Sequence, residues 1–448
     1  MGGIIYGIVI IAFIVAAVRH LGGFGAPAEV APMEALGKAM IDSAGSAVTL
    51  ALGLVGVMAL FLGLMKIAER GGLLVVIART LRPLMVRLFP EVPADHPAMG
   101  AMILNISANV LGLGNAATPF GIRAMQELDK LNPVKGTASN AMALFVAINT
   151  SSVTILPTGV VAVRAALGSE DPAGVVPTTL FATGCSTIVA IAAAKFLQRR
   201  FKVTAPSAPA GAASATAPEV DETIGDPTDT SAAPPPSAFD GATGREHGYP
   251  AWVSGLVLAF VVGLIPLMIF FGSAIAPWII PGLMVALMTF GVIKRVRIYE
   301  AFIEGAAEGF RVALRIIPYL VAILVAVAMF RSSGALDLIF GPIGAATSTI
   351  GLPAEGLIMA ILRSLSGSGA YGYMTSVLQD PAIGPDSYTG YLVSTIQGST
   401  ETTFYVLAVY FGAVQIRRVR HALAAGLIAD IAGLAAAVLI CAMLFGAA

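Results

Sequence analysis

Four runs of polar residues interrupt apolar segments of this chain, and their side chains could form hydrogen bonds where the surrounding residues cannot. The runs carry mostly amides and hydroxyls. At membrane depth such groups must find partners, and clustering around one wet cavity would satisfy all of them together. The candidate solute-binding residues are Asn105, Ser107, Asn109, Asn115, Thr118, Asn149, Ser151, Ser152, Ser366, Ser368, Gln397, Ser399, Thr400 and Thr402.

The sequence predicts neither a catalytic nor a metal centre. No nucleophile stands beside a local base, and the Cys, His and carboxylate residues do not recur at metal-ligand spacing. Gly367 to Gly372 matches G-x-G-x-x-G, but a dinucleotide site needs a preceding strand, and this match lies in an apolar helical segment. We therefore expect no enzymatic activity, no cofactor and no metal.

The stretch from Asn105 to Gly121 predicts a broken helix. It reads N-I-S-A-N-V-L-G-L-G-N-A-A-T-P-F-G, and its glycines and Pro119 free backbone groups that lipid cannot satisfy. Such a segment is stable at membrane depth only where it lines a cavity or is buried in protein. Interrupted helices of this kind form the polar sites of many transporters. Two alternatives remain open, a surface re-entrant loop and tight helix packing without a ligand.

Arg363 and Glu401 are ionisable residues within apolar or small-polar segments. Charged groups at membrane depth are costly and are functional hypotheses by default. We predict that they pair with each other. Val153 holds the place that corresponds to Glu401 in the other half of the chain, so Glu401 is the candidate for coupling to a proton or a sodium ion, with Arg363 as its counter-charge. The alternative is that each lies near a helix end and faces the cytoplasm.

The composition indicates an all-α, polytopic membrane protein. Of 448 residues, 57% are hydrophobic and only 12% are charged, whereas soluble domains average about 25% charged. The net charge is zero, so no overall field would attract nucleic acid.

We divide the chain into five regions. Residues 1–33 form an N-terminal transmembrane helix and loop, 34–202 a first half, and 297–448 a second half. Residues 203–248 are rich in Ala, Pro, Ser and Thr and predict a disordered linker, because they cannot bury enough apolar surface to fold. Residues 249–296 predict a transmembrane hairpin.

The two halves echo each other as an internal repeat. The matched pairs are Asn149 with Gln397, Ser151 with Ser399, Ser152 with Thr400 and Thr154 with Thr402. Each half also has an interrupted polar segment upstream of this run.

Basic residues predict that this repeat is inverted. The region 66–87 of the first half is basic, while its counterpart 332–351 contains no Lys or Arg. Before the last span, the first half carries acidic residues at 170–171 and the second carries arginines at 417–420. Opposite charge at equivalent positions predicts opposite topology.

Long motifs carry a resemblance to a known family. At N-I-S-A-N-V-L-G-L-G-N-A-A-T-P-F-G-I-R-A-M-Q-E-L the first half resembles spore maturation protein A. At S-G-S-G-A-Y-G and S-T-I-Q-G-S-T-E-T-T-F-Y-V-L-A-V-Y-F-G the second half resembles spore maturation protein B. The resemblance covers about Glu34 to Arg200 and Arg297 to the end. It implies two gate-type halves of the nucleoside-recognition group, which includes the gates of ferrous iron transporter B and is related to concentrative nucleoside transporters.

Together these patterns predict a permease-like protein of the bacterial inner membrane for a small polar solute, such as a nucleoside or another metabolite. The alternative is a non-transporting membrane scaffold or assembly factor. The expected partners are membrane lipid, the solute and a coupling proton or sodium ion, with no nucleic acid; a homo-oligomer is left open. The linker is expected on the cytoplasmic side.

Overall fold

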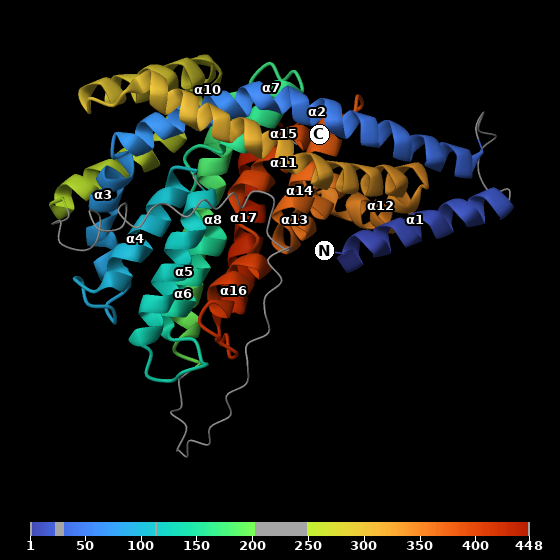
Figure 1. The fold of residues 1–448 in the computed structure, drawn as a ribbon. Helices are drawn as coiled ribbons and strands as arrows, with labels where there is room; N and C mark the ends of the chain where they lie inside the picture. Colours follow the sequence, from blue (N-terminus) through green and yellow to red (C-terminus); the bar gives the residue numbers. More distant parts are fainter. Residues whose placement is uncertain (1, 23–30, 113, 202–248, 447–448) are drawn as a thin grey trace.

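The computed structural model describes residues 2–22, 31–112, 114–201 and 249–446, and helices dominate these ranges (Figure 1). The all-α prediction is confirmed, because the only strand-like feature in the described ranges is an isolated bridge between Thr137 and Arg418. The helices of the first part are α1 (Gly2–Gly22), α2 (Pro32–Arg70), α3 (Leu73–Leu88), α4 (Pro97–Val110), α5 (Gly114–Lys130), α6 (Asn140–Ser151), α7 (Thr158–Ala166), the short 3-10 helix η1 (Pro172–Gly174) and α8 (Val175–Leu197). Those of the second part are α10 (Ala251–Ile293), α11 (Ile298–Ser332), α12 (Ala335–Ser348), α13 (Ala354–Leu365), α14 (Gly367–Gln379), α15 (Tyr388–Ser399), α16 (Thr403–Gly412) and α17 (Ala422–Phe445).

The helices from α2 to α8 and those from α11 to α17 follow the same order. Each series opens with a long helix and a shorter one, continues with two helix pairs broken in the middle, and closes with a long helix. In the first half the broken pairs are α4–α5 and α6–α7, and in the second they are α13–α14 and α15–α16. The internal repeat predicted from the sequence therefore extends to the order of the helices.

The two opening helices, α2 and α11, pack against each other in opposite directions. Lys66 near the end of α2 lies 3.5 Å from Glu304 near the start of α11. A side chain at Gly309 would come within 2.7 Å of the carbonyl oxygen of Met58, and one at Gly305 would also meet α2 backbone. Glycines on this face of α11 thus allow close approach of the two long helices.

The two closing helices, α8 and α17, also run antiparallel. One apolar core contains Val175 from the start of α8 and Ile440 from the end of α17, and a second contains Ala194 and Ala422 from the opposite ends. The hydroxyl of Ser186 bonds the Ala429 carbonyl at 2.8 Å midway between. These antiparallel pairs support the inverted repeat, which stays a prediction.

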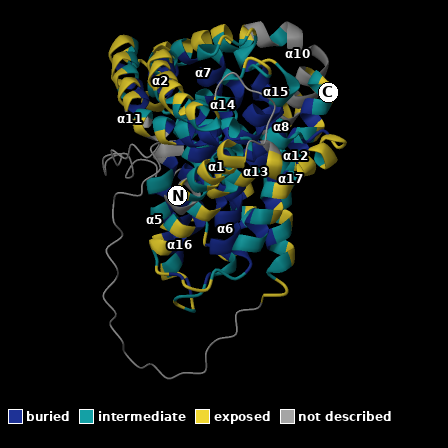
Figure 2. Cartoon of the chain, turned by 90° about the vertical axis from the view of Figure 1, so that its right-hand side faces the viewer, coloured by how far each residue is buried: buried dark blue, intermediate teal, exposed yellow. Residues whose placement is uncertain are grey.

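Helices between the two halves are buried, whereas helices on the outside expose one face. Residues Ala141 to Ser151 of α6 are all buried, and Figure 2 shows the dark blue of buried residues in the interior and yellow along α2 and α11. The exposed faces of the outer helices are apolar: Ile41 is 75% exposed and Leu52 56%. Large apolar side chains in contact with lipid need no further explanation, whereas in water they would cause aggregation.

By length and composition, three helices of the described residues could cross a membrane. They are Pro32–Arg70, Pro172–Leu197 and Ala422–Phe445. The apolar helices Tyr6–Gly22, Trp278–Ile293, Leu320–Ser332 and Leu338–Ser348 are shorter. Each member of a broken pair is too short to cross a membrane alone, so a pair could cross it only as two half-helices in series. This is what the prediction of interrupted helices requires.

One predicted region needs correction. Residues 249–296 were expected to form a transmembrane hairpin, but α10 stays helical from Ala251 to Ile293. The turn was expected between two spans at 250–271 and 276–293, and the Gly and Ser residues found there do not prevent a helix within a long apolar run. The predicted linker 203–248 lies outside the described residues.

Candidate functional site

The break between α4 and α5 lies at Gly112, as the interrupted polar stretch predicted. Gly112 has a φ of +78°, and a side chain there would collide with the Leu156 carbonyl oxygen. The conformation and the close backbone approach each require glycine. The amide of Ile155 donates to the carbonyl of Val110 at 3.0 Å. The freed carbonyl at the end of α4 is thus satisfied by the segment that follows α6.

The other breaks have related origins. After α6 ends at Ser151, the chain leaves helical geometry at Ser152 and begins α7 behind Pro157. Between α13 and α14, Ser366 is extended and its hydroxyl accepts a bond from the Gly369 amide at 3.0 Å, which caps α14. Between α15 and α16, Thr400 and Thr402 are extended. A serine cap therefore marks the start of α14 and Pro157 precedes α7, whereas Thr402 before α16 forms no side-chain cap bond.

The breaks of the two halves meet near the centre of the fold. The Glu401 amide donates to the Thr150 carbonyl at 2.9 Å, which joins the two repeated polar runs. A side chain at Gly398 would come within 3.4 Å of Pro157. The Tyr371 hydroxyl of α14 bonds the Gly159 carbonyl at the start of α7 at 3.1 Å. We call this meeting of the four breaks the central crossing.

An amide cluster forms on the α4 side of the central crossing. Asn105 donates through Nδ2 to the Ala117 carbonyl at 2.8 Å and to the Tyr410 hydroxyl at 3.0 Å. Asn109 donates to Oδ1 of Asn149 at 3.0 Å. The predicted residues Asn105, Asn109 and Asn149 are therefore brought together, and Tyr410 of the second half, which the sequence did not point to, joins them.

The structure also brings Arg363 and Glu401 together. Their side chains lie 3.4 Å apart, and Arg363 further donates to the carbonyl of Thr400 and, at 3.4 Å, to the hydroxyl of Thr402. Arg363 is buried at the end of α13, whereas 42% of the Glu401 side chain is accessible. The guanidinium thus connects the α13–α14 break with the α15–α16 break.

The other candidate solute-binding residues differ in the hydrogen bonds that their side chains form. The hydroxyls of Ser107, Ser151 and Ser399 donate to carbonyls of their own helices, and Ser368 lies 3.4 Å from the Ser366 hydroxyl. Thr118 is half-buried in α5, and the side chain of Asn115 lies outside the described part.

Several buried polar atoms of the central crossing lack a hydrogen-bond partner within the described residues. They are Oδ1 of Asn105, Oγ of Ser152, Nε of Arg363, Oε1 of Gln397 and Oδ1 of Asp430. Buried polar groups in native proteins are nearly always bonded to protein or to water. Open groups gathered at one place are therefore candidates for binding water or a polar solute, although Arg164, Arg420 and His421 also keep open buried atoms outside the central crossing.

Sequence reasoning missed Asp430. It lies near the middle of the apolar helix α17, and its Oδ2 accepts bonds from Ser364 at 2.9 Å and Thr403 at 2.8 Å. The sequence did contain a signal for this residue, because Asp430 is the one charged residue in a 24-residue apolar helix. An ionisable residue in such a segment is a functional hypothesis by itself.

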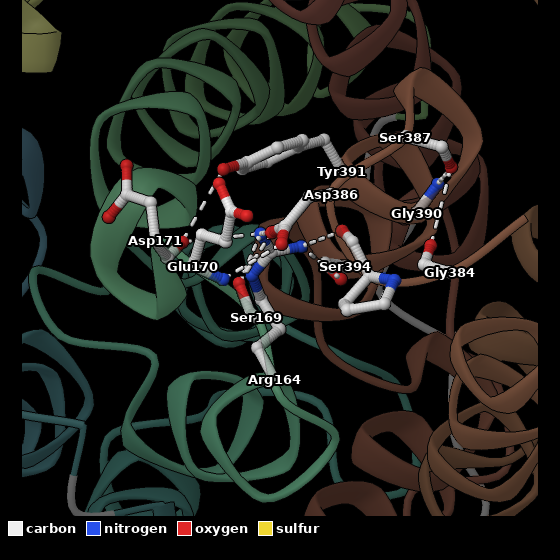
Figure 3. A network of polar contacts seen from close by, with 11 residues as sticks. Arg164, Ser169, Glu170, Asp171, Gly384, Asp386, Ser387, Gly390, Tyr391 and Ser394 are labelled. Atoms are coloured by element: carbon white, nitrogen blue, oxygen red, sulfur yellow. Dashed lines mark hydrogen bonds and ion pairs between the residues drawn. The ribbon is translucent and has the colours of Figure 1, made fainter.

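A second polar network joins the halves at one end of the bundle (Figure 3). Arg164 of α7 is fully buried, its guanidinium lies 3.0 Å from Asp386, and it donates to the Pro385 carbonyl at 2.7 Å. The Tyr391 ring lies 3.9 Å from the guanidinium carbon. The Glu170 amide donates to Asp386 at 2.8 Å. We call this set the Arg164 network.

A matching junction lies at the other end of the bundle. The Gly136 carbonyl before α6 accepts from the amides of Arg417 and Arg418 at 3.0 Å, and Arg420 donates to the Ala138 carbonyl at 2.9 Å. The loops before α6 and α17 thus meet at one end, and those before α15 and α8 at the other (Figure 1).

Comparison with known proteins places the chain among membrane proteins of one group. A family model described as "Gate: Nucleoside recognition" matches residues 51–167. Spore maturation protein B of Bacillus subtilis (strain 168) is 48% identical over 169 residues, which are 38% of this chain and 94% of that protein. Spore maturation protein A of the same strain is 45% identical over 170 residues, 38% of this chain and 87% of that protein. No solved structure matches. Because nearly the whole length of both relatives is matched at this identity, the chain belongs to the spore maturation protein A and B family.

Proposed function

We propose that this protein is a multi-pass transporter of the bacterial inner membrane, without enzymatic activity, that moves a small polar solute through the central crossing. The observation that carries the proposal is the meeting of four helix breaks, two from each half, around buried polar atoms that have no partner in the part of the chain that the structure describes. Secondary transporters bind substrate in this way, at the interface of two repeats near the middle of the membrane.

The half-helices that begin at the central crossing supply further donors. The helices α5, α7, α14 and α16 start at the four breaks, at Gly114, Thr158, Gly367 and Thr403. The first amides of a helix lack internal partners, and the helix dipole places partial positive charge there. Together with the asparagine cluster, these donors favour a neutral or anionic solute rich in hydrogen-bond acceptors.

A nucleoside is the first solute class to test. The matched family model is described by nucleoside recognition, and a nucleoside offers hydroxyls and ring acceptors that amides and serine hydroxyls can bond. The substrate proposal depends on this description and on the side-chain chemistry.

The antiparallel pairs support alternating access by an inverted repeat. If the halves are related by a two-fold axis in the membrane plane, the junction of the Arg164 network and the junction at Gly136 are equivalent gates on opposite sides. Rocking of one half against the other would open them in turn. The basic residues at 417–420 then lie in the cytoplasm with the linker.

A scaffold without transport is the second candidate, and the Arg164 network favours it. That network ties the halves together through a buried ion pair and several carbonyls, and a protein that never opens would use polar residues in this way. The relatives are named for spore maturation, and the names assign them no transport.

Solute uptake by proteoliposomes tests the proposal. The purified full chain is reconstituted and offered a panel of labelled nucleosides, nucleobases, amino acids and sugars, with empty liposomes as the background. We expect saturable uptake of at least one class, and competition by its unlabelled form. Folded, monodisperse protein that takes up nothing from the panel favours the scaffold.

A further inference from the structure

Asp430 stands out among the polar groups of the central crossing because its charge has no dedicated partner. Both hydroxyls that reach it, from Ser364 and Thr403, donate to Oδ2. Its Oδ1 is buried and has no partner within the described residues. A carboxylate that is half satisfied in an apolar helix is costly to keep charged.

The charged groups at this point do not balance. Arg363 forms an ion pair with Glu401, and it precedes Ser364 in α13. With Asp430 ionised, the three groups carry one positive and two negative charges. With Asp430 protonated, they carry one of each. Because an uncompensated charge at membrane depth is expensive, one bound proton makes the group neutral.

The other elements packed against α17 offer Asp430 no second cation. Its neighbours are α6, α8, α15 and α16. By sequence, α6 has no ionisable residue, α15 and α16 have only tyrosines, and α8 has Cys185 and Lys195. Lys195 donates to the Leu88 carbonyl at 2.7 Å near the far end of α8. Arg363 and Glu401 are therefore the charged groups that accompany Asp430.

We propose that Asp430 binds and releases a proton, and that this proton site is coupled to the solute site of the central crossing. A proton from water adds to Oδ1 of the carboxylate and gives the neutral acid, while Ser364 and Thr403 continue to donate to Oδ2. A proton fits better than a sodium ion, because both hydroxyls direct their hydrogens at the carboxylate. Glu401, already paired with Arg363, then acts as the balancing charge.

The geometry supplies the coupling. Thr403 is the first residue of α16, and Ser364 is two residues before the α13–α14 break. Both donors to Asp430 therefore lie on half-helices that end or begin at the solute site. A change of charge at Asp430 alters its bonds to both half-helices at once. Only this coupling, and not the proton binding, depends on the proposed transport function.

Infrared titration of the full chain in lipid nanodiscs tests proton binding. Acidification should produce protonated-carboxyl bands in the wild-type protein, and one component should come from Asp430. Asp430→Asn should remove that component, and Asp42→Asn, at an exposed acid of the membrane-length helix α2, should keep it. If Asp430→Asn does not fold, Asp430→Glu should keep a titrating band at a shifted frequency. A band that ignores pH, or that neither Asp430 variant alters, overturns the proton site.

Flux measurements test the coupling separately. In proteoliposomes with equal sodium on both sides, an imposed pH gradient should accelerate wild-type uptake several-fold. Uptake by Asp430→Asn should be the same with and without the gradient. Uptake that follows a sodium gradient at equal pH, or a pH response that persists in Asp430→Asn, overturns the coupling. A titrating Asp430 band in a protein that transports nothing supports the proton site and contradicts the proposed function.

Discussion

The Arg164 network and the central crossing are both polar, both buried and both made by the two halves, but they use their hydrogen bonds differently. In the Arg164 network the guanidinium meets a carboxylate, two backbone carbonyls and the face of Tyr391. In the central crossing, Asp430, Gln397 and Ser152 keep buried atoms without a partner among the described residues, whereas in the Arg164 network one such atom, Nε of Arg164, is left open. A well-bonded buried network stabilises one arrangement, whereas open polar groups are kept where something else binds. We therefore propose that the first region stabilises the fold and that the second binds solute.

The largest effect on stability is expected for Arg164→Ala. The change leaves Asp386 without its partner and removes the packing of Arg164 against Tyr391. Breaking a buried ion pair costs about 3–5 kcal/mol, and we expect about 2–3 kcal/mol here because Asp386 is 35% exposed. Thermal unfolding in detergent measures it. Arg87→Ala, at an exposed arginine of α3, is the control. Equal losses of thermal stability in the two variants would show that Arg164 has no special structural role.

A smaller loss is expected for Gly112→Ala at the first break. Its positive φ costs a side chain roughly 1–3 kcal/mol, and the Leu156 carbonyl leaves no room for a methyl group. Gly136→Ala is the matched control, because Gly136 has a φ of +74° and open space around it. The difference in unfolding temperature between the two variants measures the backbone contact alone. Identical temperatures would show that the contact at Gly112 contributes nothing.

Gln397→Leu should separate function from stability. Its Oε1 has no protein partner within the described part, so replacing the amide should change the free energy of unfolding by less than about 1 kcal/mol. If the amide binds solute, uptake should fall at least roughly tenfold, which corresponds to about 1.4 kcal/mol of lost interaction. Ser399→Ala is the neighbouring control, since that hydroxyl bonds its own helix.

The smallest effect is expected from deleting residues 206–237 of the linker. Their composition supplies no apolar core, so expression and unfolding temperature should remain nearly unchanged. Residues 34–202 and 249–448, expressed as separate chains, should also assemble and co-purify. A large loss of stability on deletion would contradict the prediction of a disordered linker.

The sequence predicted what local composition decides. Glycine, proline and amides within apolar runs indicated the breaks at Gly112 and Ser366, because a membrane helix cannot contain them without a reason. The pairing of Arg363 with Glu401 followed from the cost of charge at membrane depth.

Long-range packing decided the features that the sequence missed. Tyr410 joins the asparagine cluster from about 300 residues away in the chain, and nothing in its neighbourhood indicates that contact. The same holds for Arg164, whose carboxylate partner lies in the other half. Asp430 was visible as a lone carboxylate in an apolar helix, but only the fold shows that Ser364 and Thr403 reach it. The turn expected within α10 does not form, because a few Gly and Ser residues do not interrupt a helix in a continuous apolar run.

The most direct test of the account measures uptake and thermal stability together for Gln397→Leu and Arg164→Ala, with the solute that the wild-type protein transports. We expect that Gln397→Leu loses uptake and keeps its unfolding temperature. We also expect that Arg164→Ala loses stability, while the fraction that stays folded still takes up solute. Undiminished uptake by folded Gln397→Leu protein would contradict the assignment of the central crossing as the solute site.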